Sequence, residues 1–124
     1  LKKYPEVKGI LGTSSFDAPG TARAIDELGL KGSVFTAGTG MPAANAQILK
    51  DGSVSALTLW DPAGAGYAMA SLATKILKGE KIEDGVDLGV EGYENMHFAP
   101  GSDKVLEGNG WLKITKDNVD SLGF

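Results

Sequence analysis

One pattern recurs three times along this chain and limits what it can fold into: an apolar strand, a short polar turn, a helix with proline near its start, and a glycine that ends the helix. Proline suits the first turn of a helix and glycine suits the position after its end. Strands that alternate with helices predict βαβ units, so we expect an α/β fold with a parallel sheet and right-handed crossovers. The strands are expected at residues 7–12, 33–37 and 54–60, and the helices at 18–28, 42–50 and 62–78.

The pattern changes after Gly79. A charged turn at 80–84 is followed by short extended pieces near 86–90, 95–98 and 111–114, which read as hairpin-like strands or as chain crossing between lobes. A last short helix is expected at 116–122.

Composition excludes several classes of protein. The net charge is -4 with no cluster of lysine and arginine, so no surface is expected to bind nucleic acid. No apolar run reaches the roughly 18 residues that cross a bilayer. The chain has no cysteine, which excludes disulfides and thiolate zinc sites, and its one histidine has no metal-ligand spacing around it. No metal and no cofactor are expected.

In open α/β sheets, ligands bind beyond the carboxyl ends of the strands. The turns expected there carry hydroxyl groups, flexible glycine backbone, two aromatic rings and one carboxylate. A carboxylate accepts hydrogen bonds from hydroxyl groups, and aromatic rings cover apolar C–H faces, so this set suits a neutral, hydroxylated ligand. The candidate ligand-binding residues are Thr13, Ser14, Ser15, Phe16, Gly40, Trp60 and Asp61.

Several short motifs, in a fixed order, resemble type I periplasmic sugar-binding proteins, and most closely the branch that binds rhamnose and autoinducer-2. The motifs are Tyr4-Pro5, Val7-Lys8-Gly9-Ile10, Lys50-Asp51-Gly52, Leu57-Thr58-Leu59-Trp60-Asp61, Leu77-Lys78-Gly79 and the closing 114–119 with Phe124. In that family, two α/β lobes are joined by three hinge crossings and close on the ligand. The resemblance implies that this chain is the C-terminal part of such a receptor.

The resemblance also implies an organisation. Residues 1–60 would form part of the C-terminal ligand-binding lobe, an incomplete three-layer parallel-sheet lobe. Residues 61–97 would provide a hinge crossing, a helix and a strand that pack on the other lobe, and residues 98–124 the return crossing and the C-terminal segment. Because the helix after Asp61 would pack on a lobe that the chain largely lacks, its stripe of Ala68, Leu72 and Ile76 is expected to be exposed.

The function implied by the resemblance is binding without catalysis. The receptor would be the substrate-binding component of an ABC transporter, in the periplasm or outside the cell at a bacterial membrane. Its partners would be a small sugar-like ligand, the membrane permease, and the missing N-terminal lobe of the same receptor, with self-association of the fragment as the alternative. The residues themselves show no nucleophile with a paired base, which agrees with a protein that is not an enzyme.

Three positions are matched to family positions by the resemblance. Ser14, with Thr13 and Ser15 beside it, matches the turn from which the C-terminal lobe contacts ligand. Gly40 matches a position where many sugar binders have aspartate, so this contact would be absent or made by backbone. Asp61 matches the hinge position at which the family has a polar ligand-binding side chain.

Each candidate also has a structural interpretation. Asp61 before Pro62 is a favourable helix N-cap, and its two oxygens could serve both roles. The hydroxyls of residues 13–15 could satisfy the free amides of the next helix. Trp60 could pack at a lobe junction, Phe16 could do either, and His97 is expected to be structural.

An enzyme interpretation remains as the alternative. Gly38, Gly40 and Ala43 follow a strand and are succeeded by Asp61 about 20 residues on, which fits a dinucleotide-binding fingerprint of a Rossmann-like oxidoreductase. Pro42 counts against it, because it removes an amide that should face the pyrophosphate. A flavodoxin-like interaction module without a small ligand is a third possibility.

Overall fold

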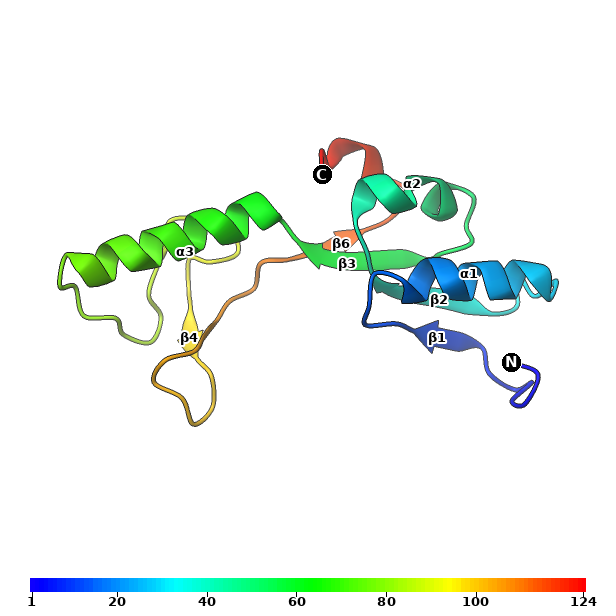
Figure 1. Cartoon of the computed structure of the whole chain (residues 1–124), viewed down its shortest axis with the longest axis horizontal. Coiled ribbons are helices and arrows are strands. Elements are labelled where there is room, and N and C mark those ends of the chain that lie inside the picture. The colour runs from blue at the N-terminus through cyan, green and yellow to red at the C-terminus, as the bar shows by residue number, and fades with distance from the viewer. The chain divides into compact units, whose positions relative to one another are not determined.

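A four-stranded sheet with the order β1-β2-β3-β6 is the frame of the fold (Figure 1). In this computed structural model, which describes residues 1–124, β1 pairs with β2 and β2 with β3, both in parallel. The prediction of an α/β fold with a parallel sheet is therefore confirmed. The strands are β1 (Gly9–Leu11), β2 (Phe35–Thr39), β3 (Ala56–Trp60) and β6 (Trp111–Ile114), and α1 (Asp17–Glu27) and α2 (Pro42–Lys50) connect the first three.

The chain divides into two units. Unit 1 consists of Leu1–Leu59 and Lys113–Phe124, and unit 2 of Trp60–Leu112. The chain thus passes from one unit to the other after Leu59 and returns after Leu112. Unit 1 is discontinuous in sequence, whereas unit 2 is a single stretch.

One face of the sheet in unit 1 forms its core. Thr36 and Leu57 are almost completely buried on this face, and Ile25 of α1 is buried with them. Burying a leucine side chain of this kind stabilises a fold by about 1.5–3 kcal/mol. On the opposite face, Leu11 and Phe35 are 84% and 55% exposed. Parallel sheets normally have both faces covered, so unit 1 contains only two of the three expected layers.

The C-terminal segment completes unit 1. Ile114 of β6 is fully buried, Val119 is 2% exposed, and Lys50 Nζ lies 2.6 Å from Asp120 Oδ1. The predicted helix at 116–122 is wrong in extent, because only the 3-10 turn η1 (Val119–Ser121) forms. Asn118 accounts for the difference: its side chain accepts from the Thr115 amide and donates to the Lys113 carbonyl, which competes with helical hydrogen bonds.

Unit 2 is built on α3 (Pro62–Leu77), the longest helix of the chain. Ala68 is 2% exposed and forms a buried cluster with Leu88 and Met96, against which Leu72 and Tyr93 pack. The expectation that Ala68 and Leu72 are exposed is wrong, because the segment after the helix folds back over this stripe. Ile76, at 57% exposure, is exposed as expected.

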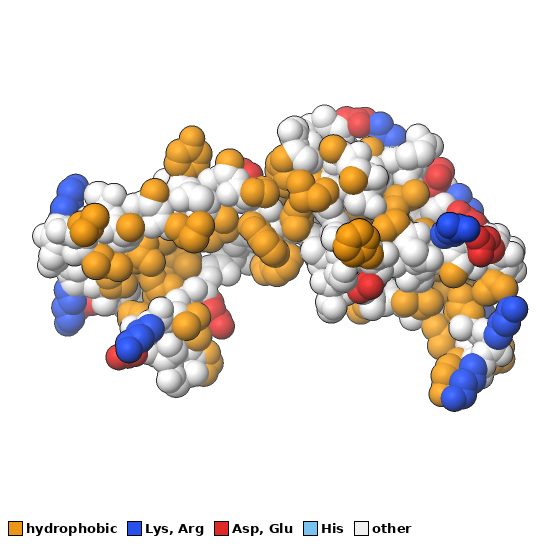
Figure 2. Space-filling model, in the orientation of Figure 1, with side chains coloured by type: hydrophobic (Ala, Val, Ile, Leu, Met, Phe, Trp, Pro, Cys, Tyr) orange, Lys and Arg blue, Asp and Glu red, His pale blue; other side chains and the backbone are white.

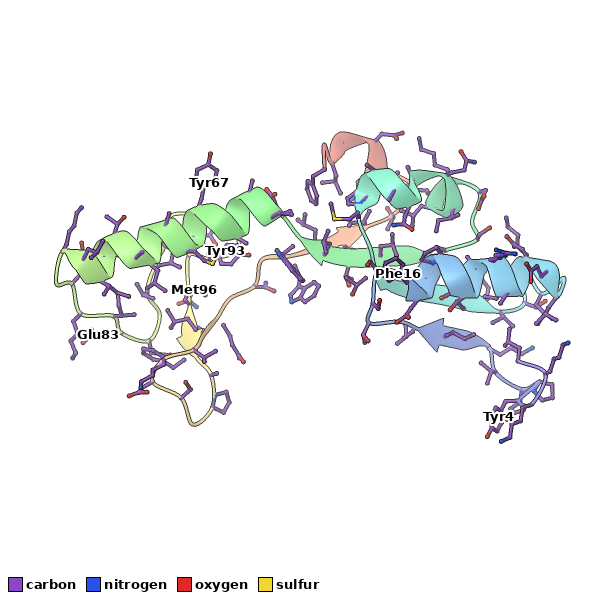
Figure 3. All side chains as sticks on the ribbon, in the orientation of Figure 1. Tyr4, Phe16, Tyr67, Glu83, Tyr93 and Met96 are labelled. Carbon is purple, nitrogen blue, oxygen red and sulfur yellow. The ribbon has the colours of Figure 1, made fainter.

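A second apolar side of α3 remains uncovered. Tyr67, Met69 and Leu77 are 72%, 68% and 88% exposed. Figure 3 shows Tyr67 on the side of α3 away from Tyr93 and Met96. Hydrophobic side chains are accordingly frequent on the surface of this unit in the space-filling view (Figure 2).

Two glycines bring the backbone of unit 2 together after α3. Gly92 has a φ of +82°, and a Cβ built on it would lie 2.5 Å from the Cα of Gly110. A Cβ on Gly110 would lie 2.7 Å from ring atoms of Tyr93. A side chain at position 92 would require the backbone near Gly110 to move, and a side chain at position 110 would require the Tyr93 ring to move.

The remaining strands of unit 2 are a short antiparallel pair, β4 (His97–Phe98) and β5 (Leu106–Glu107). The extended pieces expected at 95–98 and 111–114 correspond to β4 and β6, whereas Val86 makes only an isolated bridge to Met96. None of the helices combines the length and the hydropathy needed to span a bilayer.

Candidate functional site

The turn between β1 and α1 lies at the carboxyl end of the sheet in unit 1. Thr13, Ser14, Ser15 and Phe16 are all exposed there, and Phe16 is 82% exposed. The Ser14 hydroxyl accepts from the Phe16 amide at 3.3 Å, so one of the three hydroxyls has a local role. Figure 3 labels Phe16 at the start of α1.

Asp17 organises this turn and was not among the residues expected at the site. Its Oδ2 accepts from the amides of both Thr13 (3.0 Å) and Ser14 (2.9 Å). The carboxylate therefore holds the backbone of the turn, while the hydroxyls of Thr13 and Ser15 stay on the surface. A signal was present in the sequence, since an aspartate in the first turn of a helix is typical of such local hydrogen bonding.

The turn after β2 lies directly beside the turn after β1. The Gly12 amide donates to the Ala37 carbonyl at 3.0 Å, and a Cβ on Gly38 would lie 2.9 Å from the Gly12 carbonyl oxygen. This close approach requires glycine at position 38. It brings two of the predicted ligand-binding turns, 12–16 and 38–41, to neighbouring places on one edge of the sheet.

Gly40 is buried, and the space beside it is already filled. A Cβ on Gly40 would lie 3.0 Å from Nδ2 of Asn45 and 3.2 Å from Leu57 Cδ1. Asn45 in turn donates to the carbonyl of Met41 at 2.8 Å. A larger side chain at position 40 would displace these groups, so any ligand contact at Gly40 would come from its backbone.

Asp61 caps α3. Its Oδ1 accepts from the Ala63 amide at 2.9 Å, and Pro62 occupies the first position of the helix. The predicted N-cap role is confirmed, and it uses only one of the two carboxylate oxygens. Asp61 and Trp60 belong to unit 2, whereas the turns 12–16 and 38–41 belong to unit 1.

Trp60 contacts the second tryptophan of the chain. The rings of Trp60 and Trp111 are 5.4 Å apart between centroids and lie at 87° in an edge-to-face arrangement. These residues lie at the two ends of unit 2, where β3 leaves and β6 returns to unit 1. Both rings are still about half exposed, at 43% and 56%.

His97 takes part in a polar cluster of unit 2. Its Nδ1 lies 2.8 Å from Asp84 Oδ2, its Nε2 lies 2.9 Å from Asn95 Nδ2, and the Phe98 amide donates to Asp84 Oδ1. Chiefly the hydrogen bond from His97, and then that from Phe98, lowers the pKa of Asp84 below its usual 3.8. Through Asp84, these hydrogen bonds connect both residues of β4 to the turn at 84–85, so the role of His97 here is structural.

We expect His97→Ala to raise the pKa of Asp84 part of the way back to its ordinary value. The Phe98 amide still favours the charged carboxylate, so recovery should be incomplete. Because the pKa of Asp84 is lower in the folded protein than in the unfolded chain, the charged carboxylate stabilises unit 2 when the pH is above the unfolded-state pKa. This stabilisation is lost as the pH falls through the folded-state pKa, that is, below about pH 4. Carboxyl-carbon NMR titration measures the pKa, and an unchanged value would show that His97 does not act on Asp84.

No metal site appears among these residues. No three His, Asp or Glu side chains come close enough together to hold a metal ion. The start of α2 also counts against the dinucleotide interpretation, since Pro42 has no amide and the Ala43 amide donates to the Phe124 carbonyl oxygen at 3.2 Å. The first two residues of α2 therefore offer no free amide to a pyrophosphate group.

A shallow apolar pocket of about 180 Å³ lies elsewhere on unit 1, near the start of its strands. It offers few polar groups for a hydroxylated ligand, and it lies away from the two turns described above. Its lining includes Leu1, Pro5, Lys8, Leu28, Leu30 and Val34.

Comparison with solved structures finds the same fold. A sugar ABC transporter protein from Actinomyces odontolyticus is 28% identical, with a TM-score of 0.78 over 100% of this chain and 39% of that one. LsrB from Clostridium saccharobutylicum in complex with AI-2 is 23% identical, with a TM-score of 0.69 over 100% of this chain and 42% of that one. GanP, a glucose-galactose binding protein from Geobacillus stearothermophilus, is 20% identical, with a TM-score of 0.70 over 95% of this chain and 35% of that one. The chain spans less than half the length of each.

The family model described as a periplasmic binding protein domain matches residues 1–81. The match covers both turns at the carboxyl edge of the sheet, together with Trp60, Asp61 and the whole of α3. The chain therefore belongs to the periplasmic binding protein family and carries part of its type I α/β fold, as the order of its sequence motifs predicted.

Proposed function

We propose that this chain is the C-terminal part of the substrate-binding protein of an ABC transporter, which holds a sugar-like molecule between two lobes and releases it unchanged. The observation that carries the proposal is the edge formed by the turns 12–16 and 38–41. Side-chain hydroxyls are presented there, while Asp17 satisfies backbone amides of the first turn. Such an edge can exchange hydrogen bonds with a hydroxylated ligand.

The ligand class is supported by the relatives. Two of the structures with the same fold are a sugar ABC transporter protein and a glucose-galactose binding protein, and the third is LsrB in complex with AI-2. We propose a neutral sugar or sugar-like molecule, with rhamnose and autoinducer-2 as the specific candidates. In the assembled receptor, Thr13, Ser14, Ser15, Phe16, Gly40, Trp60 and Asp61 would contribute to its binding, and the site of action would be the periplasm or the outside of the bacterial membrane.

The uncovered surfaces support a larger receptor. Leu11 and Phe35 on the open face of the sheet, and Met69 and Leu77 on α3, are apolar and exposed. The remaining part of the same receptor would cover them, with a second copy of this chain as the alternative. The membrane permease would be the partner that receives the ligand.

We expect the full-length receptor to be stabilised by a member of a neutral sugar panel and not by a nicotinamide dinucleotide. A ligand at 100 times its Kd raises the free energy of unfolding by about 2.7 kcal/mol, which shifts the melting temperature by several degrees. Differential scanning calorimetry measures this shift. Stabilisation by the dinucleotide alone would contradict the proposal, as would recovery of chemically altered sugar after prolonged incubation with the receptor but not in buffer.

A further inference from the structure

We infer that Asp17 is a specificity-determining residue of the proposed ligand site: its carboxylate occupies the start of α1 and thereby excludes ligands that carry a phosphate or carboxylate group. The inference rests on the proposed function and narrows it, because it assigns an uncharged, hydroxyl-bearing ligand group to the turn between β1 and α1. It also gives a role to a residue that the ligand itself need not touch.

The first observation is the pair of hydrogen bonds that Asp17 accepts. The amides of Thr13 and Ser14 both point to a single oxygen, Oδ2, at 3.0 and 2.9 Å. Two adjacent amides that converge on one oxygen are the arrangement by which backbone binds an external anion. Here the anion is already supplied by the chain.

The second observation is that the Asp17 side chain lies close to the backbone of Gly12. A Cβ built on Gly12 would lie 2.3 Å from the Cβ of Asp17, so the glycine leaves the room that this side chain occupies. The main chain of Asp17 is held as well, since its amide donates to the Ser14 carbonyl at 3.0 Å. The carboxylate is therefore fixed at the turn and is not a mobile surface charge.

The third observation concerns the remaining donors on this edge of unit 1. Pro19 contributes no amide to the first turn of α1. At the neighbouring helix, Pro42 has no amide and the Ala43 amide donates to the Phe124 carbonyl oxygen. An incoming phosphate would meet the negative charge of Asp17 at the two amides that this carboxylate already occupies, whereas a hydroxyl group can donate to the carboxylate without a charge penalty.

The test uses inorganic phosphate as the probe and the full-length receptor as the protein. We compare wild type, Asp17→Ala and Glu27→Gln, the last of which removes one negative charge from the other end of α1. Amide NMR titration should show saturable shifts at Thr13 and Ser14 in Asp17→Ala, with phosphate bound about tenfold more tightly than in the other two proteins. Equal phosphate binding in Asp17→Ala and Glu27→Gln would overturn the inference.

A second variant covers the case in which Asp17→Ala does not fold. Asp17→Asn keeps an acceptor oxygen that can face the two amides but removes the charge. Phosphate should then bind about threefold more tightly than to Glu27→Gln, because only the repulsion has been relieved. Binding no tighter than to Glu27→Gln would refute the role of the charge.

An experiment with two sugars on the full-length receptor distinguishes a failure of the inference about Asp17 from a failure of the proposed function. Calorimetry with a neutral hexose and with its 6-phosphate should show that wild type prefers the neutral sugar and that Asp17→Asn lowers this preference by about threefold or more. If wild type binds no neutral sugar of the panel, the proposed function fails. If it binds the neutral sugar and Asp17→Asn keeps the full preference, only the inference about Asp17 fails.

Discussion

Replacing Asp61 with alanine in the full-length receptor is expected to weaken ligand binding by about 10- to 150-fold, because a hydrogen bond to a charged group contributes roughly 1.5–3 kcal/mol. Oδ1 of Asp61 caps α3 through the Ala63 amide. In our proposal, the other oxygen accepts from a ligand hydroxyl. Isothermal titration calorimetry with the sugar that stabilises the receptor gives the affinity directly.

The asparagine variant separates the two roles of Asp61. Asparagine still caps a helix well but loses the charge, so Asp61→Asn should keep stability and lose affinity. Loss of the cap in Asp61→Ala should cost only about 1 kcal/mol, which leaves the receptor folded. If both variants bind the sugar as tightly as wild type, Asp61 is a cap alone and has no part in the site.

Gly92→Ala is expected to lower the free energy of unfolding of unit 2 by roughly 2–5 kcal/mol. About 1–2 kcal/mol arises because a side chain disfavours the positive φ, and about 1–3 kcal/mol because the new methyl group overlaps Gly110. The contact is with backbone, so no side chain can rotate away to relieve it. Both tryptophans of the chain lie in unit 2, and their fluorescence during urea denaturation therefore reports on this unit.

Gly89→Ala is the matched control for the overlap. Gly89 also has a positive φ, +68°, but a Cβ there would meet nothing within 4 Å. Gly89→Ala should lower the free energy of unfolding only by the cost of placing a side chain at positive φ, about 1–2 kcal/mol. Equal losses in the two variants would show that the backbone near Gly110 can move aside.

The regular elements could be predicted because their ends carry local signals. Pro42 and Pro62 mark the starts of two helices, and the predicted 42–50 coincides with α2. The burial of α3 could not be predicted in the same way. Its helical period shows two apolar sides, and only the structure shows that Leu88 and Met96, far along the chain, cover the side with Ala68. The helical pattern at 116–122 failed because the Asn118 side chain competes for backbone groups.

The positions of the candidate turns follow from the order of strands and helices in a parallel sheet, so the sequence predicts them. The sequence pattern does not show which side chains form hydrogen bonds to the backbone within these turns. The sequence marks Asp17 only as an acidic residue in the first turn of a helix, whereas its two hydrogen bonds depend on a backbone that folds back toward it. The sequence also does not show that Asn45 and Leu57 fill the space beside Gly40.

The discontinuity of unit 1 has a consequence for its synthesis. On the ribosome, β1, β2 and β3 emerge first, but Ile114 and Val119, both buried in unit 1, are made only after all of unit 2. At roughly 5–20 residues per second, these last core residues are made several seconds after the first three strands, and a sheet that forms earlier has part of its core unfilled. Unit 2 can collapse around α3 during that interval, before the sheet is complete. A destabilised unit 2, as in Gly92→Ala, would then prolong the exposure of the nascent sheet and favour aggregation of the newly made chain.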